Sequence, residues 1–183
     1  MSAFTDFWSE LALPGSPLPF MLIDCAGIEG GSARIPKHIF SELECLFAGT
    51  LAIELGDVAP YLGQIKSFSA DTARLVEYLM IKQVGILVIP ENDFSTSSST
   101  AFSQMYRHFR KFNVAENPDG KKLFFRYYDP RVIFTVLNVF DASQLNEFYG
   151  PVTAFYITLK NGHTVRYTQT NGVLVKLELK NIN

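Results

Sequence analysis

Cysteine and histidine side chains are the first candidates for chemistry, because they can serve as nucleophiles, bases or metal ligands. The chain has two cysteines, Cys25 and Cys45, and three histidines, His38, His108 and His163. The histidines fall on separate predicted elements, and none of these five residues is spaced from another as in a metal site. Cys25 lies within an apolar segment, where burial raises a thiol's pKa and makes it unreactive. We therefore expect structural roles for them and no bound metal.

Motifs that carry a known chemistry are missing from the sequence: it has no P-loop, His-Glu-x-x-His helix, nucleophile elbow or EF-hand loop. Gly27-x-x-Gly30-Gly31 follows a predicted strand and resembles a nucleotide-binding loop. Its glycine spacing differs from the dinucleotide fingerprint, however, and no helix opens directly after it. The sequence thus predicts a plain surface loop, no cofactor and no enzymatic activity.

The most informative segment is Phe125–Arg131, which combines three aromatic with three charged residues. As a strand, it would place Arg126 on the face shared by Phe124 and Tyr128. A half-buried guanidinium needs a carboxylate or several carbonyl groups as partners. The candidate carboxylates are Asp24, Asp57 and Asp129.

We predict a structural network of Asp24, Arg126 and Asp129, in which Asp129 also caps the following helix. Two alternatives remain open for the same residues. They could belong to a partner-binding surface, or they could line a pocket in a small enzyme or small-molecule-binding module.

Basic residues gather near the end of a predicted helix, at Arg107, Arg110 and Lys111. The helix dipole favours cations there, so a solvated face explains them, and a docking site for an acidic patch is the alternative. Arginine and tyrosine are common anchors of protein interfaces. The predicted partner-binding residues are Arg107, Arg110, Tyr128 and Arg131, with Tyr106 as an alternative to Tyr128.

The amino-acid composition and net charge argue against nucleic-acid and membrane-surface binding. The 183 residues include 16 basic and 18 acidic side chains, a net charge of −2 that gives no field for nucleic acid or a membrane surface. Hydrophobic residues make up 48% of the chain, enough for a packed core. The few cysteines and the absence of a signal-like N-terminus or membrane-spanning apolar run predict a cytoplasmic protein.

The first 112 residues alternate predicted strands and helices, which favours an α/β (α+β) fold with a mixed sheet and packed helices. The predicted helices are 2–11, 36–43, 69–82 and one that follows 95–100. The predicted strands are 19–26 and 85–90. The last helix should bury Phe102, Met105, Tyr106, Phe109 and Phe112 and expose Gln104, Arg107, His108 and Lys111.

The C-terminal part begins with a predicted hairpin of 113–116 and 121–128 around an Asn-Pro-Asp-Gly turn. Helices should start at Asp129-Pro130 and at Asp141, and the second should end at Gly150-Pro151. Two Asn-Gly turns, at 161–162 and 171–172, predict a three-stranded antiparallel meander. We expect one domain over 1–183, with possible sub-lobes 1–128 and 129–183.

Ordered motifs in this sequence resemble a known family, the adaptor chaperones of type VI secretion effectors, first catalogued as a domain of unknown function (DUF4123-like). The most specific block is Phe125-Arg126-Tyr127-Tyr128-Asp129-Pro130-Arg131. The other blocks, in order, are 19–24, 46–50, 60–62, 107–112, 118–121 and 144–151. The resemblance covers about residues 18–151. Beyond them the sequence predicts strands, where many members carry more helix.

This resemblance implies a non-enzymatic protein of the bacterial cytoplasm. Such a protein binds a cognate toxin effector and the VgrG spike, or the tip protein of the spike, before export. The family's partner-binding surface does not follow from the motifs.

Overall fold

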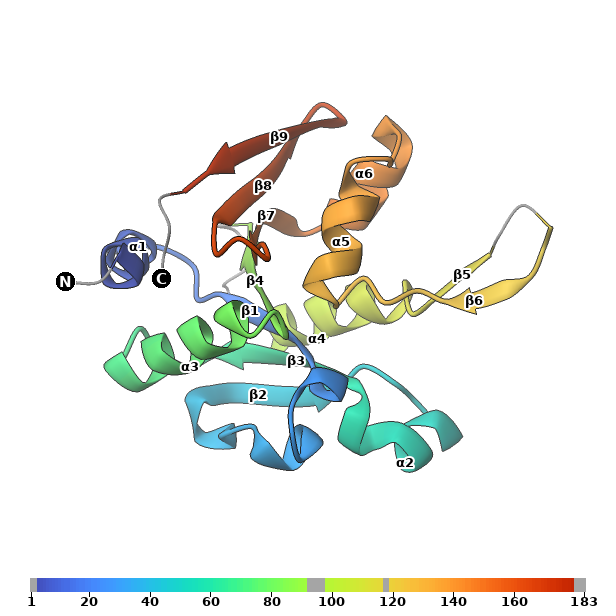
Figure 1. Ribbon diagram of the computed structural model, residues 1–183, viewed down its shortest axis with the longest axis horizontal. Coiled ribbons are helices and arrows are strands. Elements are labelled where there is room, and N and C mark those ends of the chain that lie inside the picture. Colours follow the sequence, from blue (N-terminus) through green and yellow to red (C-terminus); the bar gives the residue numbers. More distant parts are fainter. Residues whose placement is uncertain (1–2, 92–97, 117–118, 180–183) are drawn as a thin grey trace.

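A seven-stranded sheet forms the centre of the computed structural model, which describes residues 3–91, 98–116 and 119–179 (Figure 1). The strands are β1 (Phe20–Asp24), β2 (Phe40–Cys45), β3 (Pro60–Ile65), β4 (Gly85–Pro90), β7 (Val152–Thr158), β8 (Thr164–Thr170) and β9 (Val173–Glu178). Their order is β2-β3-β1-β4-β7-β8-β9, and each neighbouring pair is antiparallel. The predicted class of packed helices and strands is confirmed, although the sheet is antiparallel at these pairings rather than mixed.

Helices cover both faces of this sheet. They are α1 (Ala3–Leu11), α3 (Ala70–Ile81), α4 (Ser98–Arg110), α5 (Pro130–Leu137) and α6 (Ala142–Tyr149). A further helix, α2 (Thr50–Leu55), contributes no residue to either hydrophobic core. Short 3-10 helices are η1 (Cys25–Gly27), η2 (Gly31–Arg34), η3 (Lys37–Ile39) and η4 (Gly56–Val58). None of the helices in the described ranges has the length and apolarity that crossing a membrane requires.

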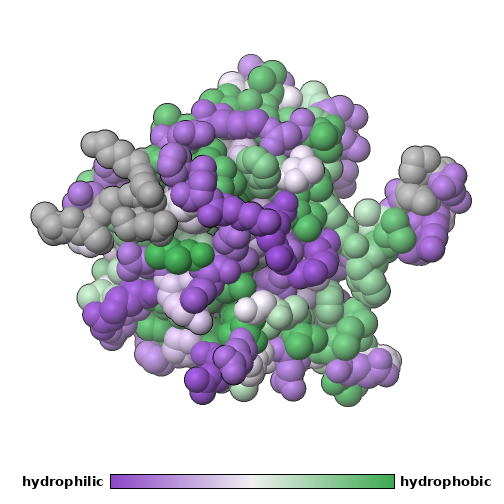
Figure 2. All heavy atoms as spheres, in the orientation of Figure 1, coloured by the Kyte–Doolittle hydropathy of each residue, from purple (hydrophilic) through white to green (hydrophobic). Residues whose placement is uncertain are grey.

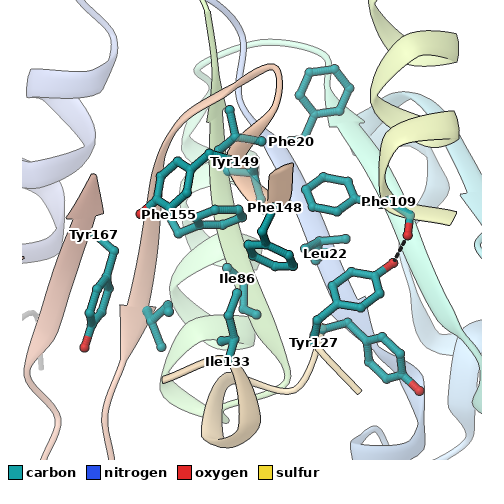
Figure 3. Packing of buried hydrophobic residues seen from close by; sticks show 14 of the residues in the cluster. Phe20, Leu22, Ile86, Phe109, Tyr127, Ile133, Phe148, Tyr149, Phe155 and Tyr167 are labelled. Atoms are coloured by element: carbon teal, nitrogen blue, oxygen red, sulfur yellow. Dashed lines mark hydrogen bonds between the residues drawn. The ribbon is translucent and has the colours of Figure 1, made fainter. Parts of the chain in front are cut away.

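Two hydrophobic cores lie on opposite faces of the sheet because side chains alternate along each strand. In β1, Phe20 and Leu22 pack against α4, α5 and α6, whereas Met21 and Ile23 pack against α1 and α3. Aromatic rings fill the first core. Figure 3 shows Phe148 stacked on Phe155, with centroids 5.5 Å apart, and the Tyr127 hydroxyl donating to the Phe109 carbonyl at 2.9 Å.

Helix ends follow the local sequence signals. The Ser69 hydroxyl accepts from the Thr72 amide and caps α3, and Asp129 caps α5 with Pro130 in the first turn. Asp141 and Gln144 form the expected capping box of α6, which ends at Gly150. The predictions of these three helix starts are confirmed.

The C-terminal meander is also confirmed, with Gly162 and Gly172 at φ values of 82° and 74°. Phe155 and Ile157 of β7 lie in the core, and Leu159 packs against it. Because β7 pairs with β4, one sheet continues across the boundary proposed at residue 128.

Two segments differ from the predictions. Residues 36–43 were expected to form a helix, but the chain forms η3 and then enters β2, the edge strand of the sheet, which pairs with β3. The hairpin is shorter than expected: β5 (Val114–Glu116) pairs with β6 (Lys122–Phe124), and residues 125–128 leave the strand. Asn117 and Pro118 of the predicted turn, and residues 95–97 before α4, lie outside the described residues.

Candidate functional site

An ion-pair cluster joins the end of β1 to the start of α5. Arg126 Nη2 lies 2.7 Å from Asp24 Oδ2 and 3.4 Å from Asp129 Oδ2. Arg131 binds Asp129 through two hydrogen bonds, from Nε at 2.8 Å and Nη2 at 2.7 Å. The structure therefore brings together the three residues predicted as a network and adds Arg131 to them.

The two carboxylates of this cluster are in different environments. Burial raises the pKa of Asp24 in spite of the neighbouring Arg126 charge, and the Oδ1 atom of Asp24 has no hydrogen-bond partner. Burial also acts to raise the pKa of Asp129, but the hydrogen bonds and charges of Arg131 and Arg126 outweigh it and lower that pKa. Asp57, the third candidate carboxylate, lies in η4 beside Gly31.

The cluster has the geometry of a clamp between two elements. Arg126 is 44% exposed and Asp24 is 2% exposed, so the pair lies at the boundary between core and solvent. The adjacent Cys25 has a pKa raised to about 12, chiefly by burial, which keeps its thiol protonated. The ion pairs of Arg126 thus hold β1 against α5, and the protonated thiol beside them is not an activated nucleophile.

The sequence places His108 on the exposed face of α4, and this prediction is wrong. His108 is buried, and its Nε2 lies 2.9 Å from the Phe148 carbonyl on α6. Burial lowers its pKa to about 4, so the ring is neutral near pH 7. Within the described ranges, no group of three or more His, Cys, Asp and Glu side chains could hold a metal ion.

Three of the four predicted partner-binding residues lie on two separate helices, and Tyr128 lies in the segment before α5. Arg107 and Arg110 are exposed on α4, where Arg110 lies over the Tyr106 ring at 5.3 Å. Arg131 is exposed on α5. Tyr128 is only 6% exposed, because the chain turns after Phe125 and carries this ring into the core. A buried ring cannot serve as the surface anchor expected of Tyr128.

An exposed apolar surface that the sequence did not indicate as a binding site lies near the C-terminal end of α4. The helix α2 has apolar residues at 51, 52, 53 and 55, yet none of its residues is buried. Ile53 is 85% exposed, and Phe124 of the hairpin is 63% exposed with its ring 6.1 Å from that of Phe47. We call this region the α2–hairpin surface. Its exposed members are Ile53, Leu55, Val58, Val114, Leu123 and Phe124, with the half-buried Phe47 beside them.

Figure 2 shows apolar side chains gathered over α2 and the base of the hairpin, which extends away from the body in Figure 1. Tyr106 links this surface to α4, because its hydroxyl donates to the Cys45 carbonyl at 2.8 Å. Arg110, which lies over the Tyr106 ring, thus borders the surface, whereas Arg107 donates to the Ser103 carbonyl one turn back along α4. One feature of the sequence indicates the exposed apolar surface. The apolar residues of α2 do not form a single helical stripe, as a buried helix face would require.

Two cavities are relevant to the sequence predictions. One of about 600 Å³ is lined partly by Gly30 and Arg34 of the glycine-rich segment. Another of about 420 Å³ reaches Arg131 but is not lined by Asp24, Arg126 or Asp129. Neither of these two cavities is lined by Asp24, Arg126 or Asp129, so the alternative of a pocket at these three residues stays a prediction.

A family model described as a domain of unknown function, DUF4123, matches residues 20–147. The chain belongs to the DUF4123 family. No curated protein matches it, and no solved structure does. The match contains the whole ion-pair cluster and the α2–hairpin surface of this DUF4123 chain, and it ends before the β7–β9 meander.

Proposed function

We propose that this chain is a non-enzymatic adaptor that binds a secreted toxin effector. It helps to load that effector onto the VgrG spike, or the tip protein of the spike, of a type VI secretion system. It acts in the cytoplasm of the producing cell. The observation that carries this proposal is the DUF4123 match over residues 20–147, together with the ordered motifs that resemble the effector adaptors.

The α2–hairpin surface supports a protein-binding role. Exposed apolar patches on soluble proteins commonly mark interaction sites. Here α2 exposes large apolar side chains, the Phe124 ring at the base of a projecting hairpin lies against Phe47, and Arg110 with Tyr106 lies at the border. Aromatic and arginine anchors surrounded by apolar contacts are the usual energetic centre of an interface.

The ion-pair cluster supports the same proposal indirectly, because it ties α5 to the sheet without presenting a reactive group. In the specific Phe125–Arg131 block, Tyr127 packs in the core, Arg126 forms an ion pair with Asp24, and Asp129 caps the start of α5. On this proposal, the distinctive motif maintains the scaffold and the exposed surface binds the partners.

The test is co-purification from cells that express the tagged chain together with the toxin and spike proteins of its own gene neighbourhood. Both partners should be retained on the chain, and loss of the chain should abolish export of the toxin. A double variant, Ile53→Asp with Phe124→Asp, should lose at least one partner while keeping its circular dichroism spectrum. Lys37→Glu, an exposed change on η3, is the matched control. Retention of neither partner by the unmodified chain would refute the proposal.

A further inference from the structure

The cavity of about 420 Å³ beside the ion-pair cluster is built from three segments far apart in the chain. These are the turn between α3 and β4, the first turn of α5, and the turn between β7 and β8. Its lining residues are Gln83, Pro130, Arg131, Phe134, Leu159, Lys160 and Asn161. Its size falls in the range of ligand-binding cavities in proteins.

The walls of this cavity combine an apolar floor with a positively charged rim. Pro130, Phe134 and Leu159 supply the apolar surface. The rim carries Arg131 and Lys160, and no lining residue is acidic. Arg131 is oriented by its two hydrogen bonds to Asp129, while 55% of its side chain stays exposed. Lys160 has no ion-pair partner among the residues that the structure describes.

The conformation of Gln83 is the second observation. The α3 helix ends in a Schellman motif, in which the Val84 amide donates to the Leu79 carbonyl and the Gln83 amide to the Met80 carbonyl, each at 3.0 Å. Gln83 occupies the position with positive φ, 54°, where glycine is preferred. Its side chain lines the cavity and donates from Nε2 to the Thr158 carbonyl at 3.1 Å.

A residue other than glycine has a higher free energy at positive φ, and such residues are common at ligand-binding positions. The Gln83 amide fastens the α3–β4 turn to the end of β7, and so fixes one wall of the cavity. The Phe125–Arg131 block builds the opposite wall, because Pro130 and Arg131 are its last two residues.

We propose that this cavity binds an acidic segment of a partner polypeptide that inserts one aromatic side chain. The aromatic ring lies on Pro130, Phe134 and Leu159, and the flanking carboxylates face Arg131 and Lys160. The cavity is open, since Arg131, Phe134, Lys160 and Asn161 are all exposed, which suits a side chain presented by a polypeptide. This inference rests on the proposed adaptor function and adds a second contact to the α2–hairpin surface.

Titration of the ¹⁵N-labelled full chain by NMR tests the proposal. The probe is the peptide Gly-Ser-Asp-Phe-Asp-Ser-Gly, blocked at both ends, and saturable shifts should centre on Phe134, Lys160 and Asn161. Replacing the Phe of the probe by Ala, or both Asp by Asn, should weaken binding about fivefold or more. Shifts that centre elsewhere, equal binding of the Asn peptide, or no saturable binding would each overturn the proposal. Equal binding of free phenylpropionate would assign the cavity to a small molecule and overturn the polypeptide assignment.

Variants of the chain separate binding from folding. Lys160→Glu should weaken the probe about fivefold or more, whereas Lys37→Glu, a surface charge change away from the cavity, should leave binding unchanged. Gln83→Gly relieves the positive φ, so the chain should stay folded while probe binding falls. Unchanged binding in both cavity variants would overturn the proposal. Failure of the probe alongside co-purification of the toxin would refute this site and leave the adaptor function standing.

Discussion

Arg126 and Asp24 lie 102 positions apart in the chain, and their side chains meet at 2.7 Å. The pair joins the specific aromatic-arginine block to the central strand β1. Since Asp24 is almost fully buried, it would be left without its counter-charge if Arg126 were removed.

Arg126→Ala should lower the free energy of unfolding by about 1–3 kcal/mol, less than for a fully buried pair because Arg126 is half exposed. Arg131→Ala should cost less, since Asp129 keeps the Arg131 backbone amide and Arg126 as partners. Urea denaturation of both variants measures the difference. If Arg126→Ala were as stable as the unmodified chain, the ion pair of Arg126 with Asp24 would not stabilise the contact between β1 and α5.

His108 should make stability depend on pH. In the unfolded chain its pKa is near 6.5, whereas burial holds it at about 4 in the fold. Between these values the unfolded state binds a proton that the folded state does not, so stability is full above pH 6.5 and falls as pH decreases toward 4. The loss should reach roughly 2–3 kcal/mol.

The His108→Gln variant should lack this component of the pH profile, while His163→Gln, on an exposed turn, should retain it. Urea denaturation between pH 4 and pH 7 compares the three proteins. A His108→Gln profile that parallels that of the unmodified chain would show that the ring does not titrate as the structure indicates.

Gly31 is required by close packing. It has a φ of 62°, and a Cβ placed there would lie 2.2 Å from the Asp57 carbonyl oxygen. Gly31→Ala should therefore destabilise the chain by about 2 kcal/mol or more. At Gly15 φ is also positive, 86°, but nothing lies within 4 Å of a built Cβ, so Gly15→Ala should cost only about 1 kcal/mol. Thermal melting of both variants tests this, and similar losses would argue against the Asp57 contact.

Local signals in the sequence predicted the parts of the fold that local chemistry decides. The Asp129-Pro130 start of α5, the Asp141 capping box and the two Asn-Gly turns each satisfy backbone groups within a few residues. Residues 36–43 show the limit of such signals. Pro36 suits a helix start, but pairing with β3, about 20 residues later, makes the segment a strand.

The candidate site depended even more on distant contacts. The sequence offered three carboxylates for Arg126 without distinguishing them, and only the position of β1 beside α5 selects Asp24 and Asp129. His108 looked exposed on the α4 pattern, because the covering residue Phe148 is 40 positions away. The positive φ of Gln83 and the exposure of α2 carry no local signal of comparable strength.

The basic border of the α2–hairpin surface should contribute to partner binding. Reversing the charge at Arg107 and Arg110 together should weaken binding to the effector or the spike, because both side chains are exposed in the last turn of α4, where Arg110 lies over Tyr106. Stability should change little, since the change touches a solvated helix face. Pull-down of each partner, with melting curves alongside, tests this. If the folded double variant still bound both partners fully, Arg107 and Arg110 would be solvent-exposed residues with no part in binding.

Calorimetric titration of the purified chain with the purified toxin, and separately with the purified spike protein, tests the adaptor function most directly. We expect saturable one-to-one binding of the toxin at micromolar or tighter affinity and measurable binding of the spike protein or its tip. We also expect that the Ile53→Asp, Phe124→Asp variant binds at least one of them more weakly by about tenfold or more. Absence of binding to both folded partners would contradict the account.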